Sequence, residues 1–247
     1  MPDNRQHRGQ HPSDAFLFGP SQLPKMQQAV KDLSWLLSRG YSERSSLKLV
    51  GDRYRLRDRQ RLGVRRSACS RQSASRRQAH LLGEAGMRGN TLHIDGFNLL
   101  ITVESALSNG FILEGVDDCL RDMASIHGSY RRVMETEGAI RLTGQALQLL
   151  EADKAVWYLD RPVSNSGRLR EALLDHAARE GWHWEVELPD NPDSRLKKVQ
   201  GPVASSDSVV LDHVEQWFNM ARFIIFRFTP QALILPLGHL AKTEFPI

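Results

Sequence analysis

The spacing of hydrophobic residues changes along the chain, from a helical period to alternating short strand-like and helical stretches. In the first third, apolar residues recur at helical spacing, and the clearest run lies between Leu23 and Leu37. Ser42 is expected to cap a shorter helix over residues 43–50, and a third helix is expected over residues 57–78. The pattern therefore predicts an all-α segment before residue 80.

From residue 91 onward, short apolar runs with strand character alternate with helical segments. This alternation predicts an α/β fold, in which a mostly parallel sheet is flanked by helices and joined by right-handed crossovers. The expected strands cover residues 92–95, 111–113, 155–159, 182–188, 199–204, 223–228 and 233–237, and the expected helices cover residues 99–107, 117–150 (broken near Gly128 and Gly138), 168–179 and 208–218.

The pattern divides the chain into four parts. Residues 1–21 are polar and are expected to form a disordered tail, and residues 22–80 form a basic helical module. Residues 81–90 contain three glycines and are expected to be a linker, and residues 91–240 form the α/β domain.

Composition restricts the setting of the protein. Hydrophobic residues make up 40% of the chain, and no apolar run is long enough for a membrane span, so no membrane partner is expected. Cys69 and Cys119 lack a CxxC neighbour, which excludes zinc-finger and thioredoxin chemistry. Two unpaired cysteines fit a reducing, cytoplasmic setting.

Charge is unevenly distributed along the chain. Residues 1–90 hold 18 Lys and Arg against 7 Asp and Glu, a net charge of +11, whereas residues 91–247 hold 15 against 22, a net charge of −7. Ten arginines and one acid lie between Arg53 and Arg77, and guanidinium groups make bidentate contacts with phosphate. We therefore expect nucleic-acid contact here; the alternative is a solvated helix that pairs with the acidic domain. The candidate contacts are Arg59, Arg61, Arg65 and Arg66.

Three acids follow expected strands. Asp95 ends the first strand of the α/β domain and is followed by Gly96 and Asn98, while Asp160 ends a later strand and Asp207 opens the helix after another. Carboxyl ends of parallel strands lie on one edge of a sheet, so these residues are expected to converge. Each acid alone could instead be an ordinary turn or cap residue.

A cation would be needed to hold such acids together, because neighbouring carboxylates repel one another. Oxygen ligands without His or Cys favour Mg²⁺ or Mn²⁺, which could activate water and stabilise charge on a phosphodiester. Asp117, Asp118 and Asp122 are expected at a helix start, where Asp118 and Asp122 share a face, and Glu104 lies about two turns after Asp95.

The stretch IDGFNLLITVE, with YLDRPVSNSG and VASSDSVVLD, resembles the PIN and NYN ribonuclease superfamily. More closely, residues 25 to 230 resemble a bacterial and archaeal family of unknown function, domain-of-unknown-function family 434. The residues that carry this second resemblance are Arg39-Gly40-Tyr41, Leu49-Val50-Gly51-Asp52-Arg53-Tyr54 and Arg59-Gln60-Arg61.

The superfamily resemblance implies a PIN-like parallel sheet whose edge holds three or four acids binding Mg²⁺ or Mn²⁺. Asp95 would be the first acid, Asn98 the polar residue after it, Asp160 the acid of a later strand, and Ser206-Asp207 the pair before a late helix. Asn98 and Ser206 are expected to contact substrate. Asp118 or Asp122 would supply the remaining acid, with Asp117 and Glu104 as less favoured choices.

The loop over residues 161–167 departs from the PIN pattern. Its hydroxyl groups on Ser164 and Ser166 precede a helix, and helix N-termini favour anions, so they could hold a phosphate. The alternative is that one of these serines simply caps the helix.

Two functions fit these observations. The first is a metal-dependent ribonuclease, with Asp95, Asp118, Asp160 and Asp207 as catalytic acids and the basic module holding RNA. The second is a non-catalytic nucleic-acid-binding protein with an incomplete PIN-like site. A phosphohydrolase for small phosphate esters is disfavoured because it leaves the arginines unexplained. PIN-like proteins often pair, so a homodimer is an open alternative.

Overall fold

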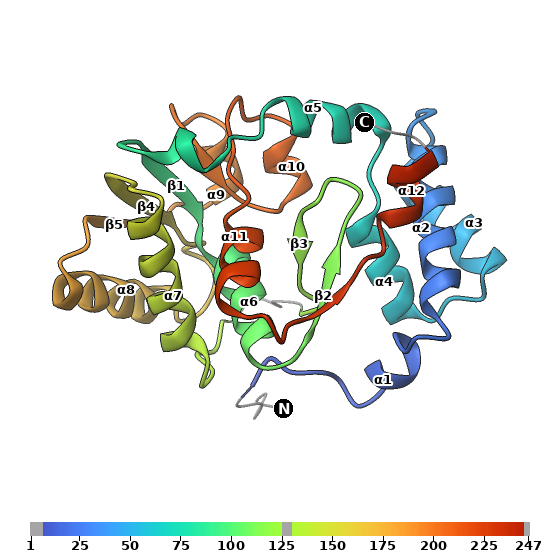
Figure 1. Ribbon diagram of the computed structural model, residues 1–247, viewed down its shortest axis with the longest axis horizontal. Helices are drawn as coiled ribbons and strands as arrows, with labels where there is room; N and C mark the ends of the chain where they lie inside the picture. Colours follow the sequence, from blue (N-terminus) through green and yellow to red (C-terminus); the bar gives the residue numbers. More distant parts are fainter. Residues whose placement is uncertain (1–6, 125–129, 245–247) are drawn as a thin grey trace.

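A four-stranded parallel sheet forms one half of the molecule (Figure 1). The computed structural model describes residues 7–124 and 130–244. The strand order is β5-β4-β1-β6, and every neighbouring pair is parallel. This arrangement confirms the predicted mixed α/β class with helices flanking a parallel sheet. The strands are β1 (Thr91–Asp95), β4 (Lys154–Tyr158), β5 (Trp184–Glu187) and β6 (Val203–Ala204).

Helices cover both faces of this sheet, and β4 is apolar on both sides, whereas β1 is apolar on one side and carries His93 on the other. On one face, Leu92, Ile94 and Trp157 share a core with the helices α6 (Gly96–Leu107), α7 (Thr136–Leu149), α8 (Ser166–Glu180) and α11 (Met220–Phe228). On the other face, Val156 and Tyr158 pack with the segment that carries α9 (Pro192–Leu196) and α10 (Ser208–Leu211).

A second, three-stranded sheet lies between the parallel sheet and the N-terminal helices (Figure 1). Its order is β3-β2-β7, where β2 (Phe111–Glu114) pairs antiparallel with β3 (Leu120–Arg121) and parallel with β7 (Leu233–Leu235). The C-terminal strand therefore returns to a strand that lies more than a hundred residues earlier.

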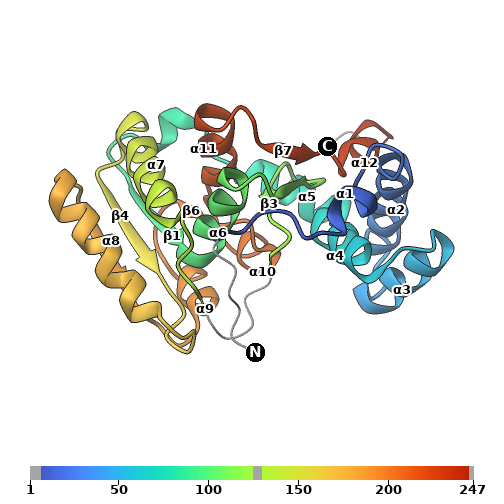
Figure 2. The ribbon, with the colours of Figure 1, turned by 90° about the horizontal axis from the view of Figure 1, so that it is seen from below.

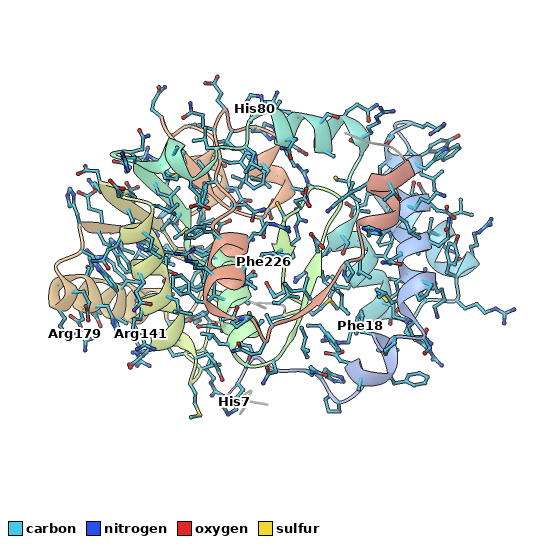
Figure 3. All side chains as sticks on the ribbon, viewed as in Figure 1. His7, Phe18, His80, Arg141, Arg179 and Phe226 are labelled. Atoms are coloured by element: carbon cyan, nitrogen blue, oxygen red, sulfur yellow. The ribbon has the colours of Figure 1, made fainter. Side chains whose placement is uncertain are left out.

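The N-terminal helices share a hydrophobic core with this second sheet. Leu113, Val116 and Leu237 pack in the same cluster as Met26 and Leu33, and the ring of Phe18 (labelled in Figure 3) lies 5.7 Å from that of Phe111. Figure 2 shows the C-terminal helix beside the N-terminal helices, and it packs on α2. The helices of this half are α1 (Asp14–Leu17), α2 (Leu23–Leu37), α3 (Glu43–Arg53), α4 (Asp58–Ser67), α5 (Arg71–Ala79) and α12 (His239–Glu244).

The predicted helix over residues 57–78 is two helices, α4 and α5. The chain is extended at Ala68, and Ser70 begins α5, where its hydroxyl accepts from the backbone N–H of Ser73 at 3.0 Å. Serine competes for backbone hydrogen bonds in this way and favours helix starts.

The prediction of a long helical region over residues 117–150 is wrong in its first part. Asp118 has a left-handed backbone (φ 60°), and the N–H of Gly115 donates to the carbonyl of Cys119, so the chain turns from β2 into β3. Helix α7 begins only at Thr136. The expected break at Gly128 lies outside the described residues.

Two expected elements near the C-terminus also differ. Residues 223–228 form the end of helix α11, not a strand, because Asn219 caps this helix and Ile224 and Ile225 are buried while Phe226 is exposed (Figure 3). The helix expected over residues 208–218 stops at Leu211, since the backbone of Trp217 bonds to residues 80 and 82.

The expected tail and linker are both anchored where the structure describes them. Arg8 pairs with the buried Glu104, and α1 lies within residues 1–21. In the linker, a 3₁₀ helix (Glu84–Met87) forms, Met87 is fully buried, and the N–H of Leu82 donates to the carbonyl of Trp217 at 2.8 Å. Across the described ranges, none of the helices has the length and apolar character that a bilayer crossing needs.

Candidate active site at the carboxyl edge of the parallel sheet

Asp95 lies at the junction between the central strand β1 and helix α6. It is only 8% exposed, and its Oδ2 accepts a hydrogen bond from the hydroxyl of Ser205 at 2.8 Å. Glycine suits the next position, because a Cβ on Gly96 would lie 2.5 Å from Cδ2 of the buried Leu159 and 3.1 Å from the carbonyl of Tyr158. The DG pair therefore lets the start of α6 approach β4 closely and seats Asp95 at the sheet edge.

The segment after β6 is tied to the segment after β1. The backbone N–H and the hydroxyl of Ser206 both donate to Oδ1 of Asn98, at 2.8 and 2.9 Å. Ser205 donates to Asp95 and accepts from the N–H of Asp207 at 3.0 Å. The Asn98 carbonyl oxygen thus positions the Ser205–Asp207 turn, which is an architectural role for a residue predicted to contact substrate.

Three further acids surround Asp95 at this edge. Asp160 follows β4 and is half-buried, Asp207 follows β6, and Asp193 lies in the first turn of α9 after β5. Asp207 caps α10, with one carboxylate oxygen accepting from the N–H of Val209 at 2.6 Å. We call Asp95, Asp160, Asp193 and Asp207 the acidic edge.

The neighbouring acids raise the pKa of Asp95 in particular. Burial raises the pKa of Asp95 to about 7, the bond from Ser205 opposes this rise, and the charges of Asp207, Asp193 and Asp160 add to it. Burial and the charge of Asp193 raise the pKa of Asp160, and burial and the charge of Asp207 raise that of Asp193, against Lys197. Carboxylates in this state favour a bound proton or a bound cation.

Asp193 was not predicted from the sequence. A signal was present, because the loop over residues 189–194 is rich in Pro and Asp and directly follows a predicted parallel strand. The same rule that selected Asp95 and Asp160, an acid beyond the carboxyl end of a strand, would have selected Asp193.

The donor chemistry of the acidic edge fits Mg²⁺ or Mn²⁺, since all its side-chain donors are carboxylate or hydroxyl oxygens. Within residues 7–124 and 130–244, however, no group of three or more His, Cys, Asp or Glu side chains is placed to hold one metal ion. Mg²⁺ commonly binds through one or two carboxylates and keeps waters and substrate phosphates as its other ligands. The acidic edge can therefore serve a cation only in that open manner.

Asp118 and Asp122, predicted as the fourth acid, are held by other groups. Asp118 is in the β2–β3 turn, and its carboxylate pairs with Lys242 of α12. Asp122 is buried, and its two oxygens accept from Thr102 at 3.1 Å and from the N–H of Ala124 at 2.6 Å. Because the expected helix is absent, the two residues do not share a helix face.

Asp117 and Glu104 are buried anchors. Asp117 accepts two bonds from Arg121, at 2.9 and 2.7 Å, and one from Arg77, and these guanidinium groups hold its pKa well below the usual range against the effect of burial. Glu104 is fully buried, accepts bonds from Arg8, Tyr130 and Thr136, and has a pKa raised by burial.

Asp117 and the two arginines bonded to it, Arg77 and Arg121, form what we call the Asp117 cluster. This cluster contacts the acidic edge at one point. The Nε of Arg121 donates to the carbonyl of Ser206 at 2.8 Å, while the hydroxyl of Ser206 donates to Asn98. The buried ion pair therefore supports the turn that carries Ser205 and Asp207.

The serine loop before α8 is positioned by Tyr130. The backbone N–H of Tyr130 donates to the carbonyl of Ser164, and the amide of Asn165 donates back to the carbonyl of Tyr130. Ser164 is exposed, whereas Ser166 is buried and its hydroxyl lies 3.4 Å from the carbonyl of Arg161. Asn165 occupies the cap position and makes no side-chain cap bond, so neither serine is the cap. Phosphate contact by Ser164 and Ser166 stays a prediction.

Three of the four candidate arginines of the basic module make internal bonds. Arg59 forms a bidentate pair with the buried Asp14, Arg61 bonds to Asp52 and to the carbonyl of Leu56, and Arg66 bonds to the carbonyls of Asp122 and Ala124. Arg65 differs, since its guanidinium is 3.8 Å from Glu43 and both side chains are about half exposed. Internal bonds thus account for Arg59, Arg61 and Arg66, but only Arg66 reaches the acidic domain, as the alternative interpretation of the charge pattern expected.

These features define an α/β protein with an acidic sheet edge and a helical N-terminal half. Residues 25–80 match the family described as "Protein of unknown function (DUF434)", and residues 84–223, more than half of the chain, match "Domain of unknown function (DUF5616)". The chain is 31% identical over 186 residues to "Uncharacterized protein MJ0935" of Methanocaldococcus jannaschii, covering 75% of this chain and 88% of that protein. The chain therefore belongs to the family described as "Domain of unknown function (DUF5616)", and the resemblance to family 434 is confirmed over residues 25–80, not over the whole of residues 25 to 230. No solved structure matches it significantly.

Proposed function

We propose that the protein is a divalent-metal-dependent nuclease that hydrolyses RNA phosphodiester bonds at the acidic edge. The observation that carries this proposal is a set of four acids beyond strands of one parallel sheet, with raised pKa values on Asp95, Asp160 and Asp193. Perturbed carboxylates at the carboxyl edge of an α/β sheet are typical of ligand and catalytic sites. The resemblance of residues 94–104 to PIN and NYN ribonucleases supports the same reaction.

The residues of the chain have distinct roles in this proposal. Asp95, held by Ser205, and the more exposed Asp160, Asp193 and Asp207 supply oxygen ligands and carry the negative charge that attracts the cation. When bound, Mg²⁺ or Mn²⁺ would lower the pKa of water and stabilise charge on the phosphate. Ser206 and Asn98 fix the distance between the turns after β1 and β6, and Ser164 is available for phosphate contact.

One observation favours a second function, a nucleic-acid-binding protein without catalysis. Among the described residues, no three His, Cys, Asp or Glu side chains are placed to bind one metal ion, as expected for an incomplete PIN-like site. In that case exposed cations such as Arg65 would hold RNA phosphates, and binding would weaken steeply as salt rises.

The test is Mn²⁺-dependent cleavage of generic single-stranded RNA at pH 8. We expect Asp95→Asn to reduce the rate about 100-fold, because the negative charge that would hold the cation beside the phosphate is lost. The matched control is Asp190→Asn, since Asp190 is exposed and pairs with Arg161 on the surface.

Equal rates for the wild-type protein and Asp95→Asn would exclude these acids as the catalytic group. RNA binding that weakens steeply with salt, without any cleavage, would support the second function instead.

A further inference from the structure

A cavity of about 390 Å³ opens in the helical half of the molecule, between α2, α5 and α12. Its buried wall includes Cys69, Ala74, Val116 and Ala241, and none of these residues belongs to the acidic edge. The volume lies in the range of about 300 to 1,000 Å³ that is common for small-molecule sites.

An aromatic side chain and a guanidinium form the rim of this cavity. Trp35 is 42% exposed although it is large and apolar, and the guanidinium carbon of Arg39 lies 3.5 Å from the centroid of its indole ring. The Nη1 of Arg39 donates to the carbonyl of Trp35 at 3.3 Å, which helps to hold the pair in place. Indole and guanidinium planes are the surfaces on which proteins stack nucleobases.

Trp35 stands between two hollows. It also lines a second concave region of about 580 Å³ together with Leu36, Leu49, Val50 and Arg53. Asp32 also lines this second region and lies 3.8 Å from Arg53, so the region is less suited to a phosphate than the first cavity with Arg39 at its rim.

A buried hydroxyl in the wall lacks a partner. Ser34 lines the cavity, is only 6% exposed, and its Oγ has no hydrogen bond in the part of the chain that the structure describes. An unsatisfied buried hydroxyl costs about 1 to 3 kcal/mol, so such groups usually have a water or a ligand as partner. The Oγ itself is covered in this structure, so a polar edge of a molecule in the cavity would reach it only by displacing a neighbouring side chain of the wall.

We propose that this cavity binds a nucleotide, with the base stacked at Trp35, a polar group of the base bonded to Ser34, and the phosphate near Arg39. The chemistry is shared by a free mononucleotide and by a unit of single-stranded RNA. The inference concerns binding by the helical half and does not depend on cleavage at the acidic edge.

The test is calorimetric titration of the full chain with AMP, a short oligoadenylate and inorganic phosphate. We expect AMP to bind, phosphate alone to bind much more weakly, and Trp35→Ala to weaken AMP binding about 5- to 150-fold because stacking is lost. Ser34→Ala should weaken it about 2- to 12-fold. The matched control is Tyr41→Ala, which removes an exposed aromatic ring from the same half outside the cavity.

Ser34→Ala also separates binding from folding. Because its hydroxyl makes no internal bond, this variant should melt at the wild-type temperature or above while losing affinity. Oligoadenylate that binds more tightly than AMP would identify strand binding, and equal affinities would identify a free nucleotide. Binding unchanged in Trp35→Ala and Ser34→Ala, no binding of AMP, or phosphate binding as tightly as AMP would overturn the proposal.

Discussion

The Asp117 cluster and the acidic edge are neighbours with opposite electrostatics. Both contain a buried aspartate, and Arg121 and Ser206 connect them. Asp117 is bonded to two guanidinium groups and its pKa is lowered, whereas Asp95 is bonded to a serine hydroxyl, is surrounded by acids, and has its pKa raised to about 7. The same residue type is thus a stabilising anchor in one place and a destabilising charge in the other.

The comparison identifies Asp95 as the buried carboxylate of this pair that no neighbouring arginine neutralises. Arginines are present in the immediate surroundings, yet Arg77 and Arg121 are committed to Asp117. An uncompensated buried carboxylate lowers stability, and such groups persist mostly where a ligand or a reaction requires them. The contrast therefore agrees with the cation proposed for the acidic edge and gives no reason to expect one at the Asp117 cluster.

The largest expected change in stability comes from replacing Asp117. Asp117→Asn would leave Arg77 and Arg121, which are 1% and 8% exposed, without their shared carboxylate. We expect the free energy of unfolding to fall by about 3 to 5 kcal/mol, as for other buried ion pairs that lose one partner. Urea unfolding at pH 7 measures this, with Asp190→Asn as the surface control; a loss below that of the control variant would contradict the account.

At the acidic edge, we expect replacement of the buried aspartate to raise the free energy of unfolding. A pKa raised from 3.8 to about 7 corresponds to a penalty of roughly 4 kcal/mol on the ionised form of Asp95. Below about pH 4 the group is protonated in both the folded and the unfolded state, and as pH rises to 7 the folded protein loses stability relative to the unfolded chain. Asp95→Asn removes this loss, so the variant should gain stability over the wild type by up to that amount above pH 7.

The pH profile provides the control for this prediction. Any fixed cost of placing an amide at position 95 is the same at all pH values, so the stability difference between variant and wild type should grow between pH 4 and 7 and then level off. Thermal unfolding without divalent metal at pH 4, 5.5, 7 and 8 measures it. A pH-independent difference would show that Asp95 is not a strained charge.

Much of the parallel sheet could be predicted from the sequence, because its strands are short apolar runs that end in polar residues. Asp95, Asp160 and Asp207 were found by the same rule, and the charges of Asp160 and Asp207 both raise the pKa of Asp95. Two of the misassigned elements show where local bonds override the apolar pattern: Asn219 starts a helix across the run Phe223 to Phe228, and the left-handed Asp118 turns the chain.

The roles of the arginines could not be predicted, because their partners are distant in sequence. Arg59 meets Asp14 across 45 residues and Arg66 meets Asp122 across 56. A charge count shows an excess of arginine but does not distinguish a guanidinium that joins two segments from one that faces a ligand. Asp118 was selected because it was expected on a helix face. That helix does not form, and the carboxylate of Asp118 pairs with Lys242.

The most direct test of the central claim is Mn²⁺ binding at pH 8, measured by electron paramagnetic resonance of the free ion. If the acidic edge is a cation site, the wild-type protein and Asp190→Asn should bind Mn²⁺ equally, and Asp95→Asn and Asp193→Asn should each bind it at least about 10-fold more weakly. Equal Mn²⁺ affinity in all four proteins, or no binding by the wild type, would contradict the assignment of the acidic edge as a metal site.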